Sequence, residues 1–158
     1  REHIMETLQA VKASEIPTFW FWPNVDAGSD GTSNGIRSFR EKENPENIHF
    51  FKNMEPLDFL RLLKFSKLLA GNSSVGIREC SYLGVPVLNI GNRQQRRLRA
   101  ENVTDIDYKK EAILKQIKRL FNTDPFPRST IYGNGEAGKK IADILASVEL
   151  KSSKVISY

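Results

Sequence analysis

Apolar residues follow two alternating spacings along this chain. In some segments they return every third or fourth residue, as Ile4, Leu8 and Val11 do, which places them on one face of a helix. In others they form short runs such as Val87–Ile90, which are typical of buried strands. The pattern predicts strands over residues 18–22, 48–51, 67–70, 86–90 and 102–106, and helices over residues 2–13, 30–42, 73–82, 108–121 and 136–148, with one more that starts at residue 55.

Strands that alternate with helical segments of about ten to fifteen residues indicate right-handed crossovers and a parallel sheet. The sequence therefore predicts the α/β class, as one doubly wound parallel sheet of the Rossmann-like type with helices on both faces. In the helix that starts at residue 55, we expect Leu57, Leu60, Leu62 and Leu63 to face the interior. We assign residues 1–150 to this domain and residues 151–158 to a polar C-terminal tail.

Length and composition fit one globular domain. The chain has 158 residues, of which 39% are hydrophobic, so it can bury a full core and disorder is not expected. Because Arg1 already lies within a helical pattern, we expect the chain to be part of a longer protein. No apolar stretch approaches the length of a membrane span, and the single cysteine, Cys80, has no internal disulfide partner. We therefore expect a cytoplasmic protein without membrane association, bound metal or cofactor.

The segment Gly71-Asn-Ser-Ser-Val-Gly-Ile-Arg-Glu79 is the most informative part of the chain. Ser73 and Ser74 stand where a helix is predicted to begin, so free backbone N–H groups, two hydroxyls and the positive end of the helix dipole would converge on one anion. Glu79 follows about six residues later, within reach of the vicinal hydroxyls of a ribose whose diphosphate lies at the helix start. A serine before a helix is, however, most often only a cap, and Glu79 could instead form a surface ion pair with Arg78 or Arg93.

Basic residues concentrate just after the predicted strand 86–90. The formal net charge is +5, and Arg93, Arg96, Arg97 and Arg99 lie within seven residues of one another. Such a cluster attracts phosphate or is simply a solvated loop. Because ligands bind outside the carboxyl ends of parallel strands, we expect four loops to face one crevice, namely residues 23–31, 52–54, 71–74 and 91–97.

Two common nucleotide motifs are absent, the dinucleotide fingerprint G-x-G-x-x-G and the Walker A lysine motif, so neither NAD nor ATP is the expected ligand. The Gly-x-x-x-x-Gly-x-x-Glu helix start and the Gly84-Val-Pro86 turn resemble the C-terminal, nucleotide-sugar-binding domain of two-domain GT-B enzymes. Together with Pro23-Asn-Val-Asp-Ala-Gly28, Pro86-Val-Leu-Asn-Ile-Gly-Asn-Arg-Gln94 and Glu101-Asn-Val103, they resemble UDP-N-acetylglucosamine 2-epimerases. The resemblance spans residues 1–148 and is stronger to the hydrolysing branch.

This resemblance implies UDP and UDP-N-acetylglucosamine as ligands. Ser73 and Ser74 would hold the diphosphate, Glu79 the ribose, and Arg93 would help to bind the nucleotide or to position the sugar, with Gly76 as a further UDP-binding residue. Asn24 would reach into the same cleft, and the backbone around Met54 would meet the uracil. Where the family shows Gly-Arg-Glu after the glutamine, this chain has Arg96-Arg97-Leu98-Arg99, which leaves open which of Arg96, Arg97 and Arg99 matters for binding.

The resemblance also implies a reaction. In this family the C2 proton is removed, UDP departs by anti elimination, and water adds to give N-acetylmannosamine for sialic-acid-type sugars of cell-surface polysaccharides; in the other branch UDP adds back. The catalytic acidic residues would belong to an N-terminal domain that this chain lacks, and a histidine of a His-Pro segment would lie just upstream of Arg1; His3 and His49 do not match that histidine. We therefore expect the chain alone to bind UDP weakly and to be inactive, and the whole enzyme to be a homodimer.

Three other functions remain open from the sequence. A GT-B glycosyltransferase would share this half and differ in its N-terminal half. A non-catalytic regulatory module could bind a nucleotide in the same crevice. The arginine cluster could bind nucleic acid, although it lacks interleaved aromatic residues, and we expect no nucleic-acid partner. Cys80 has no neighbouring histidine and is interpreted as a small core residue.

Overall fold

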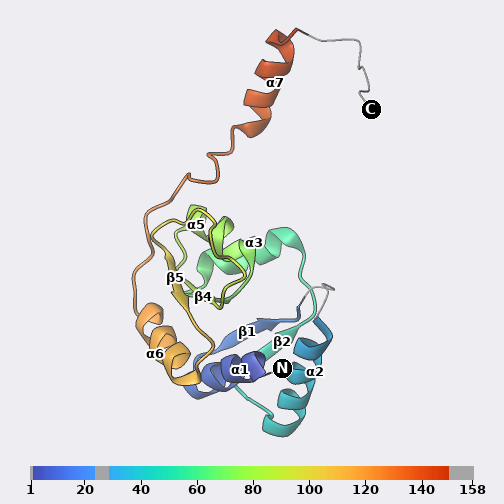
Figure 1. Ribbon diagram of the computed structural model, residues 1–158, viewed down its shortest axis with the longest axis vertical. Coiled ribbons are helices and arrows are strands. Elements are labelled where there is room, and N and C mark those ends of the chain that lie inside the picture. Colours follow the sequence, from blue (N-terminus) through green and yellow to red (C-terminus); the bar gives the residue numbers. More distant parts are fainter. Residues whose placement is uncertain (1, 24–28, 150–158) are drawn as a thin grey trace, which may run out of the picture.

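The computed structural model describes residues 2–23 and 29–149 (Figure 1). Each predicted segment forms close to its predicted bounds, except that the segment 73–82 is divided into two helices. The strands are β1 (Thr18–Phe21), β2 (Ile48–Phe51), β3 (Leu69–Gly71), β4 (Val87–Ile90) and β5 (Val103–Ile106). The helices are α1 (Glu2–Ser14), α2 (Ser29–Glu43), α3 (Pro56–Phe65), α4 (Ser74–Ile77), α5 (Glu79–Leu83), α6 (Lys110–Phe121) and α7 (Ala137–Ser147).

All strand pairs are parallel, which confirms the predicted α/β class. Hydrogen bonds divide the strands into a two-stranded sheet, β1-β2, and a three-stranded sheet, β3-β4-β5, where we expected a single sheet. In each sheet the strands lie side by side in chain order, with β1 next to β2 in one sheet and β4 between β3 and β5 in the other. The loops after β3 and β4 leave the carboxyl ends of paired parallel strands, which is the edge where open α/β sheets bind ligands.

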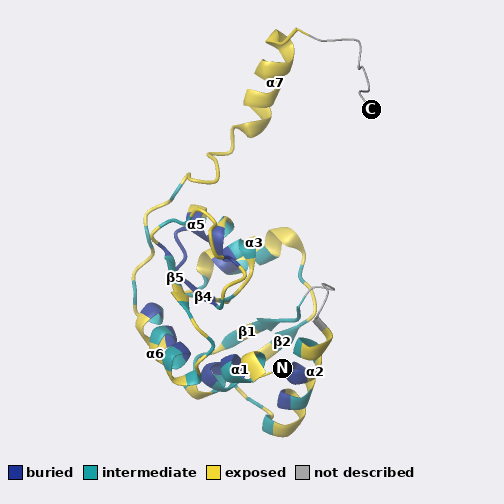
Figure 2. Cartoon of the chain, in the orientation of Figure 1, coloured by how far each residue is buried: buried dark blue, intermediate teal, exposed yellow. Residues whose placement is uncertain are grey.

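One hydrophobic core holds the two sheets together. Helix α1 packs between α2 and α6 on one face of the molecule (Figure 1). Leu8 and Val11 of α1, Ile48 of β2, Leu88 of β4 and Ile117 of α6 belong to the same buried cluster. Figure 2 shows this burial on the inward sides of α1 and α6. A smaller cluster lies beneath α3 and α5, so helices cover both faces, as the crossover pattern predicts.

Local sequence signals explain where helices begin and end. Glu55 caps α3 by accepting hydrogen bonds from the backbone N–H groups of Leu57, at 2.8 Å, and Asp58, and Pro56 occupies the first turn. Gly84 ends α5 in the left-handed conformation, with φ of 73°. A Cβ there would lie 2.2 Å from the carbonyl oxygen of Phe126, so only glycine fits.

The prediction for the leucines of α3 is wrong in part. Leu63 is buried, but Leu57 and Leu60 are 54% and 40% exposed. The helix packs one side against α5 and the smaller core and leaves the other side open. Helical spacing alone does not show how wide the covered side is.

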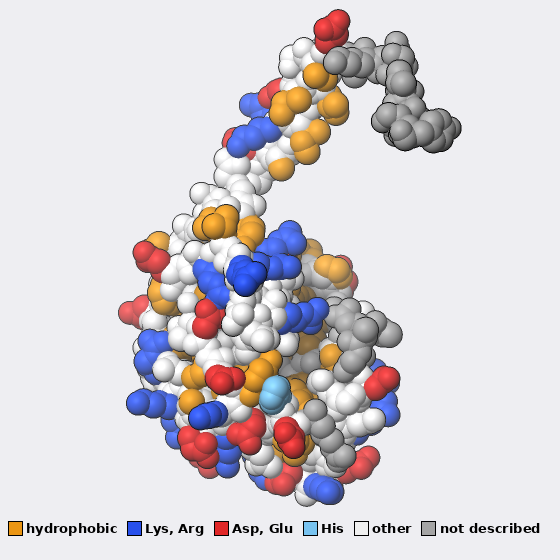
Figure 3. All heavy atoms as spheres, viewed as in Figure 1, with side chains coloured by type: hydrophobic (Ala, Val, Ile, Leu, Met, Phe, Trp, Pro, Cys, Tyr) orange, Lys and Arg blue, Asp and Glu red, His pale blue; other side chains and the backbone are white. Residues whose placement is uncertain are grey.

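Helix α7 stands away from the rest of the described chain (Figure 1). None of its residues is buried, and Ile141, Ile144 and Leu145 are exposed on it. Figure 3 shows hydrophobic side chains gathered along one side of this helix. In residues 2–23 and 29–149, no helix is long and apolar enough to cross a bilayer.

Candidate functional site

The loop of residues 71–74, called here the serine loop, leaves the carboxyl end of β3 and enters α4. The Ser73 side chain caps α4 by accepting a hydrogen bond from the Val75 backbone N–H at 3.3 Å. Asn72 and Ser73 are exposed and Ser74 is half-buried, so the polar groups of the turn face solvent. An anion that reaches this turn would meet the hydroxyls of Ser73 and Ser74, whereas the N–H groups of Val75 and Gly76 already donate to Oγ and to the carbonyl oxygen of Ser73, at 3.3 and 3.2 Å.

The predicted helix over residues 73–82 is interrupted at Arg78, and this changes the electrostatic argument. The Ser81 hydroxyl donates a hydrogen bond to the carbonyl oxygen of Ile77 one turn earlier, a contact that bends helices. Helix α4 is only four residues long. Its dipole is weaker than that of the long helix we expected, and an anion here depends on the donors of the turn itself.

Gly76 lies buried in α4, close to the sheet. A Cβ at this position would be 2.8 Å from Cγ1 of Val87 and 3.2 Å from Cδ2 of Leu69. The absence of a side chain therefore lets α4 approach β3 and β4, and packing is enough to explain this glycine. Its predicted part in UDP binding stays a prediction.

Glu79 begins α5, and one of its carboxylate oxygens is in an unusual position. Oε2 is buried and has no hydrogen-bond partner among the described residues. A buried carboxylate oxygen without a donor is costly, and hydroxyl groups of a ligand would satisfy it. A surface ion pair through this oxygen, the alternative interpretation, is not what the structure shows.

Cys80, next along α5, is fully buried in the smaller core. Burial raises the pKa of its thiol to about 12, and the charge of Glu79 acts in the same direction. The thiol therefore stays protonated and unreactive at neutral pH, which confirms that Cys80 is a core residue.

The arginine loop, residues 91–99, follows β4. The Gly91 N–H donates to the carbonyl oxygen of Ile106 at 2.8 Å, and at this position φ is 84°. A turn follows in which Arg96 adopts a φ of 64°, a left-handed conformation that is rare for a residue with a side chain. Arg93, Arg96 and Arg97 are exposed, whereas Gln94 is buried.

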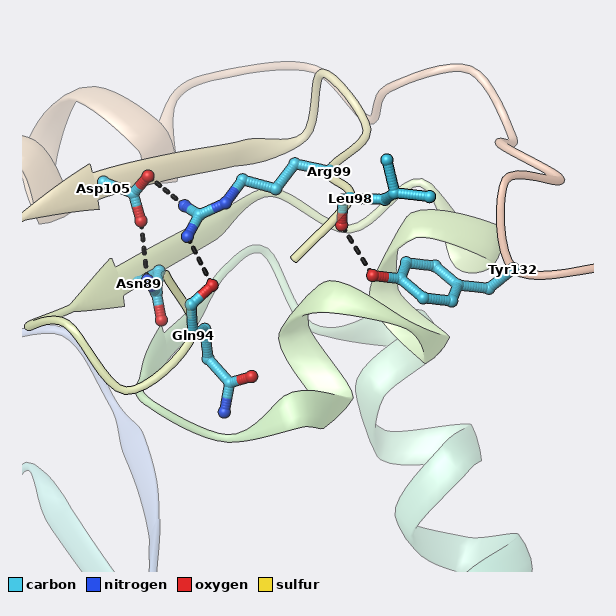
Figure 4. Close-up of polar contacts among 6 residues, drawn as sticks. All are labelled: Asn89, Gln94, Leu98, Arg99, Asp105 and Tyr132. Atoms are coloured by element: carbon cyan, nitrogen blue, oxygen red, sulfur yellow. Dashed lines mark hydrogen bonds and ion pairs between the residues drawn. The ribbon is translucent and has the colours of Figure 1, made fainter. Parts of the chain in front are cut away.

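Arg99 connects this loop to the sheet (Figure 4). Its Nη1 pairs with Oδ2 of Asp105 on β5, and its Nη2 donates to the backbone oxygen of Gln94 at 2.6 Å. Asn89 on β4 donates from Nδ2 to the other oxygen of Asp105 at 2.6 Å. The hydrogen bond from Arg99 holds the pKa of the Asp105 carboxyl below its usual value, burial opposes this, and the Asn89 amide adds to it.

Gln94 joins the arginine loop to the serine loop. Its Nε2 donates to the backbone oxygen of Asn72 at 2.8 Å. The structure therefore brings together two of the four loops that we expected to share a crevice. The residues Asn72, Gln94 and Asp105 were missed from the sequence; one available signal was Asn89, a polar residue in an apolar strand that, once buried, needs a hydrogen-bond partner.

Met54 is not joined to this cluster by any contact among the described residues. Met54 follows β2, is half-buried, and donates its backbone N–H to Oδ1 of Asn53 at 2.9 Å, so this donor is already engaged. Asn24 and most of the loop 23–31 lie outside the described residues. A hollow of about 360 Å³ lies elsewhere, beside β2 at Arg40 and His49. Among the described residues, no three metal-ligating side chains gather at one point.

A Rossmann-like α/β domain with polar loops at the carboxyl ends of β3 and β4 defines the class of this protein. The chain belongs to the UDP-N-acetylglucosamine 2-epimerase family, because a sequence profile of that family matches residues 1–146. This confirms the family expected from the sequence motifs.

Individual relatives agree with this assignment. The chain is 29% identical over 145 residues to the UDP-N,N'-diacetylbacillosamine 2-epimerase (hydrolyzing) of Legionella pneumophila, covering 92% of this chain and 38% of that protein. It is 24% identical to the UDP-N-acetylglucosamine 2-epimerase of Neisseria meningitidis, covering 94% of this chain and 39% of that protein. The chain thus spans about two fifths of these curated relatives.

A solved structure supports the fold. The crystal structure of the Methanocaldococcus jannaschii UDP-GlcNAc 2-epimerase in complex with UDP-GlcNAc and UDP superposes with a TM-score of 0.62 at 17% identity. The superposition covers 91% of this chain and 53% of that one. At this identity the likeness shows the shared fold alone.

Proposed function

We propose that this chain is the UDP-binding part of a hydrolysing UDP-N-acetylglucosamine 2-epimerase. The observation that carries the proposal is the Glu79 carboxylate, whose Oε2 is buried and unpaired within the described residues. Glu79 lies on the helix pair that follows the Ser73–Ser74 turn. A ribose whose diphosphate rests on that turn offers hydroxyl donors to this oxygen.

The proposed contacts follow from the loops at the carboxyl ends of the strands. The hydroxyls of Ser73 and Ser74 bind the diphosphate, Gly76 lets α4 pack against the sheet beneath that turn, and Arg93 adds positive charge after β4. The carbonyl of Met54 is the backbone group that remains to meet the N–H of uracil, because the Met54 N–H is already bound to Asn53. Asn24 completes the cleft in this proposal.

The proposed reaction converts UDP-N-acetylglucosamine and water to N-acetylmannosamine and UDP. A base removes the C2 proton, the C1–O bond to UDP breaks with its electron pair leaving on the diphosphate, and water adds across the resulting double bond. The described residues serve the departing diphosphate, whose growing charge is stabilised by hydroxyl, N–H and cationic donors. The base and acid come from the rest of the protein. The Asn89-Ile-Gly-Asn-Arg-Gln94 motif and the similarity to the Legionella enzyme named as hydrolyzing support this branch.

The rest of the full-length protein is proposed to complete this domain. The exposed apolar side chains of α7 need a cover, and within the described residues β1, β2, β3 and β5 each pair with a neighbour on one edge only. The curated relatives, which are about two and a half times as long, contain enough additional chain to supply both. A homodimer of the whole enzyme stays a prediction.

The test uses the full-length protein that contains this chain. Proton NMR of the products from UDP-N-acetylglucosamine distinguishes free N-acetylmannosamine, which is expected, from its UDP conjugate, which would contradict the hydrolysing assignment. The 158-residue chain alone is expected to bind UDP in calorimetry and to form no product. A chain that binds no UDP would contradict the proposed site. Ser74→Ala in the full-length enzyme is expected to slow turnover by weakening the hold on the diphosphate.

A further inference from the structure

Arg99 lies between the sheet and the turn of the arginine loop. Its guanidinium pairs with Asp105 on β5 and donates to the backbone oxygen of Gln94, and its side chain is only 21% exposed (Figure 4). Each terminal nitrogen therefore already donates to an oxygen of the protein. Its partial burial distinguishes Arg99 from Arg96 and Arg97, which are both exposed.

Gln94 connects Arg99 to the serine loop through two hydrogen bonds. The residue whose backbone oxygen accepts from Arg99 also donates from Nε2 to the backbone oxygen of Asn72. Gln94 is 3% exposed, so its side chain has little freedom to move. The reversed amide would place Oε1 against the Asn72 oxygen, two acceptors facing each other, so the donor must be on this side.

These contacts form a continuous path from β5 to the turn before α4. The path runs from Asp105 through Arg99 and Gln94 to Asn72, which directly precedes Ser73. The Tyr132 hydroxyl adds a second tether by donating to the Leu98 oxygen at 2.6 Å (Figure 4). The geometry of the serine turn thus depends on a side chain that lies more than twenty residues further along the sequence.

We propose that Arg99 is a positioning residue: it anchors the arginine loop on β5 and, through Gln94, holds the Asn72–Ser74 turn in the position that binds the diphosphate. The inference rests on the proposed function, because the diphosphate is the ligand assigned to that turn. Arg99 acts through Gln94 and does not contact the nucleotide. Of the three arginines whose roles the sequence leaves open, Arg96 and Arg97 remain to meet the anion.

The opposite role, in which Arg99 itself binds the diphosphate, predicts a different response to Asp105→Asn. Removing the carboxylate would free the guanidinium and remove a nearby negative charge, so a direct phosphate ligand would bind UDP more tightly. A positioning residue loses its anchor in the same variant, and UDP binds more weakly. The sign of this one change separates the two roles.

The first experiment needs no nucleotide. Amide hydrogen exchange is measured on the chain and on Arg99→Gln and Gln94→Glu, the second of which keeps the size of the side chain and removes the donor to Asn72. We expect the amides of residues 75–78 to exchange about tenfold faster in both variants, the size of effect that losing one charge-assisted hydrogen bond produces, while those of α6 stay unchanged. Unchanged exchange at residues 75–78 would overturn the proposal.

The second experiment measures UDP and uridine binding to the same proteins and to Asp105→Asn. Arg99→Gln and Asp105→Asn are each expected to weaken UDP binding about tenfold, and the double variant no further, because both remove one anchor. Uridine, which lacks the diphosphate, should bind all of them alike. Tighter UDP binding by Asp105→Asn, or an equal loss for uridine, would refute the positioning role.

Arg61→Gln is the matched control. It removes the same charge, and its partner Asp58 is exposed on α3. It is expected to match the unmodified chain in both experiments. An unmodified chain that fails to bind UDP would remove the proposed function, while the exchange measurement would still decide whether Arg99 holds the turn.

Discussion

Glu79→Ala offers the sharpest test of the ribose site, because the free and bound states respond in opposite directions. In the free protein the buried Oε2 of Glu79 has no donor among the described residues, which costs about 1–3 kcal/mol for a desolvated polar group. In the complex a ribose hydroxyl would donate to it, and a hydrogen bond to a charged group contributes about 1.5–3 kcal/mol. We expect Glu79→Ala to weaken UDP binding by about 1–3 kcal/mol, or about 5-fold to 150-fold, without lowering the stability of the free protein.

Titration calorimetry with UDP and 2′-deoxy-UDP, together with urea unfolding, measures both effects. The unmodified chain should prefer UDP, and Glu79→Ala should bind the two nucleotides alike. Glu41→Ala, which removes an exposed carboxylate from α2, is the control and should leave both affinities unchanged. Unchanged UDP affinity in Glu79→Ala, or a large loss of stability in the free protein, would show that this carboxylate is structural and refute the reasoning.

Four further predictions concern stability and reactivity. Gly84→Ala is expected to lose at least about 2 kcal/mol in urea unfolding, because φ is 73° and its Cβ would lie 2.2 Å from the Phe126 oxygen; an unchanged midpoint would contradict this. Arg96→Gly should gain about 0.5–1 kcal/mol, because its φ of 64° is costly for any residue with a side chain, and a lower melting temperature would count against that strain. Cys80, with a pKa of about 12, should resist thiol reagents at neutral pH until the protein unfolds, and rapid labelling of the native protein would disprove its burial. The pKa of Asp105 is lowered in the folded state, so the stability that its carboxylate contributes is present above the ordinary carboxyl pKa and is lost as pH falls through the lowered value. The unfolding free energies of the unmodified chain and Asp105→Asn should therefore converge in acid, and a constant difference between pH 7 and about pH 3 would contradict the ion pair.

Much of the fold could be predicted because its signals are local. The start of α3 follows from Glu55 and Pro56, whose capping contacts involve neighbours only a few residues away. The left-handed end of α5 follows from Gly84 in the same way. The break at Arg78 was missed although the contact of Ser81 with Ile77, which accompanies it, is also local, because a serine in a helix need not bond to the preceding turn.

In the candidate site, too, some residues could be predicted from local signals and others could not. Ser73, Ser74 and Glu79 could be proposed from a serine pair, a helix start and a carboxylate at a fixed spacing. The network of Asn89, Asp105 and Arg99 could not, because it depends on the register that places Asn89 opposite Asp105 across β4 and β5. The spacing of residues along the chain does not show which residues of β4 and β5 lie opposite each other.

The amino-acid sequence by itself determined the order of helices and strands, the parallel α/β class and the family, since periodicity, caps and short motifs act over a few residues. Only the tertiary structure decided which leucines of α3 are covered, that Gly76 serves close packing against Val87, and that Arg99 is held by Asp105 and Gln94. The physical reason is that burial and hydrogen bonding between distant residues arise from how the strands align and which helix faces meet, and these depend on the whole chain at once.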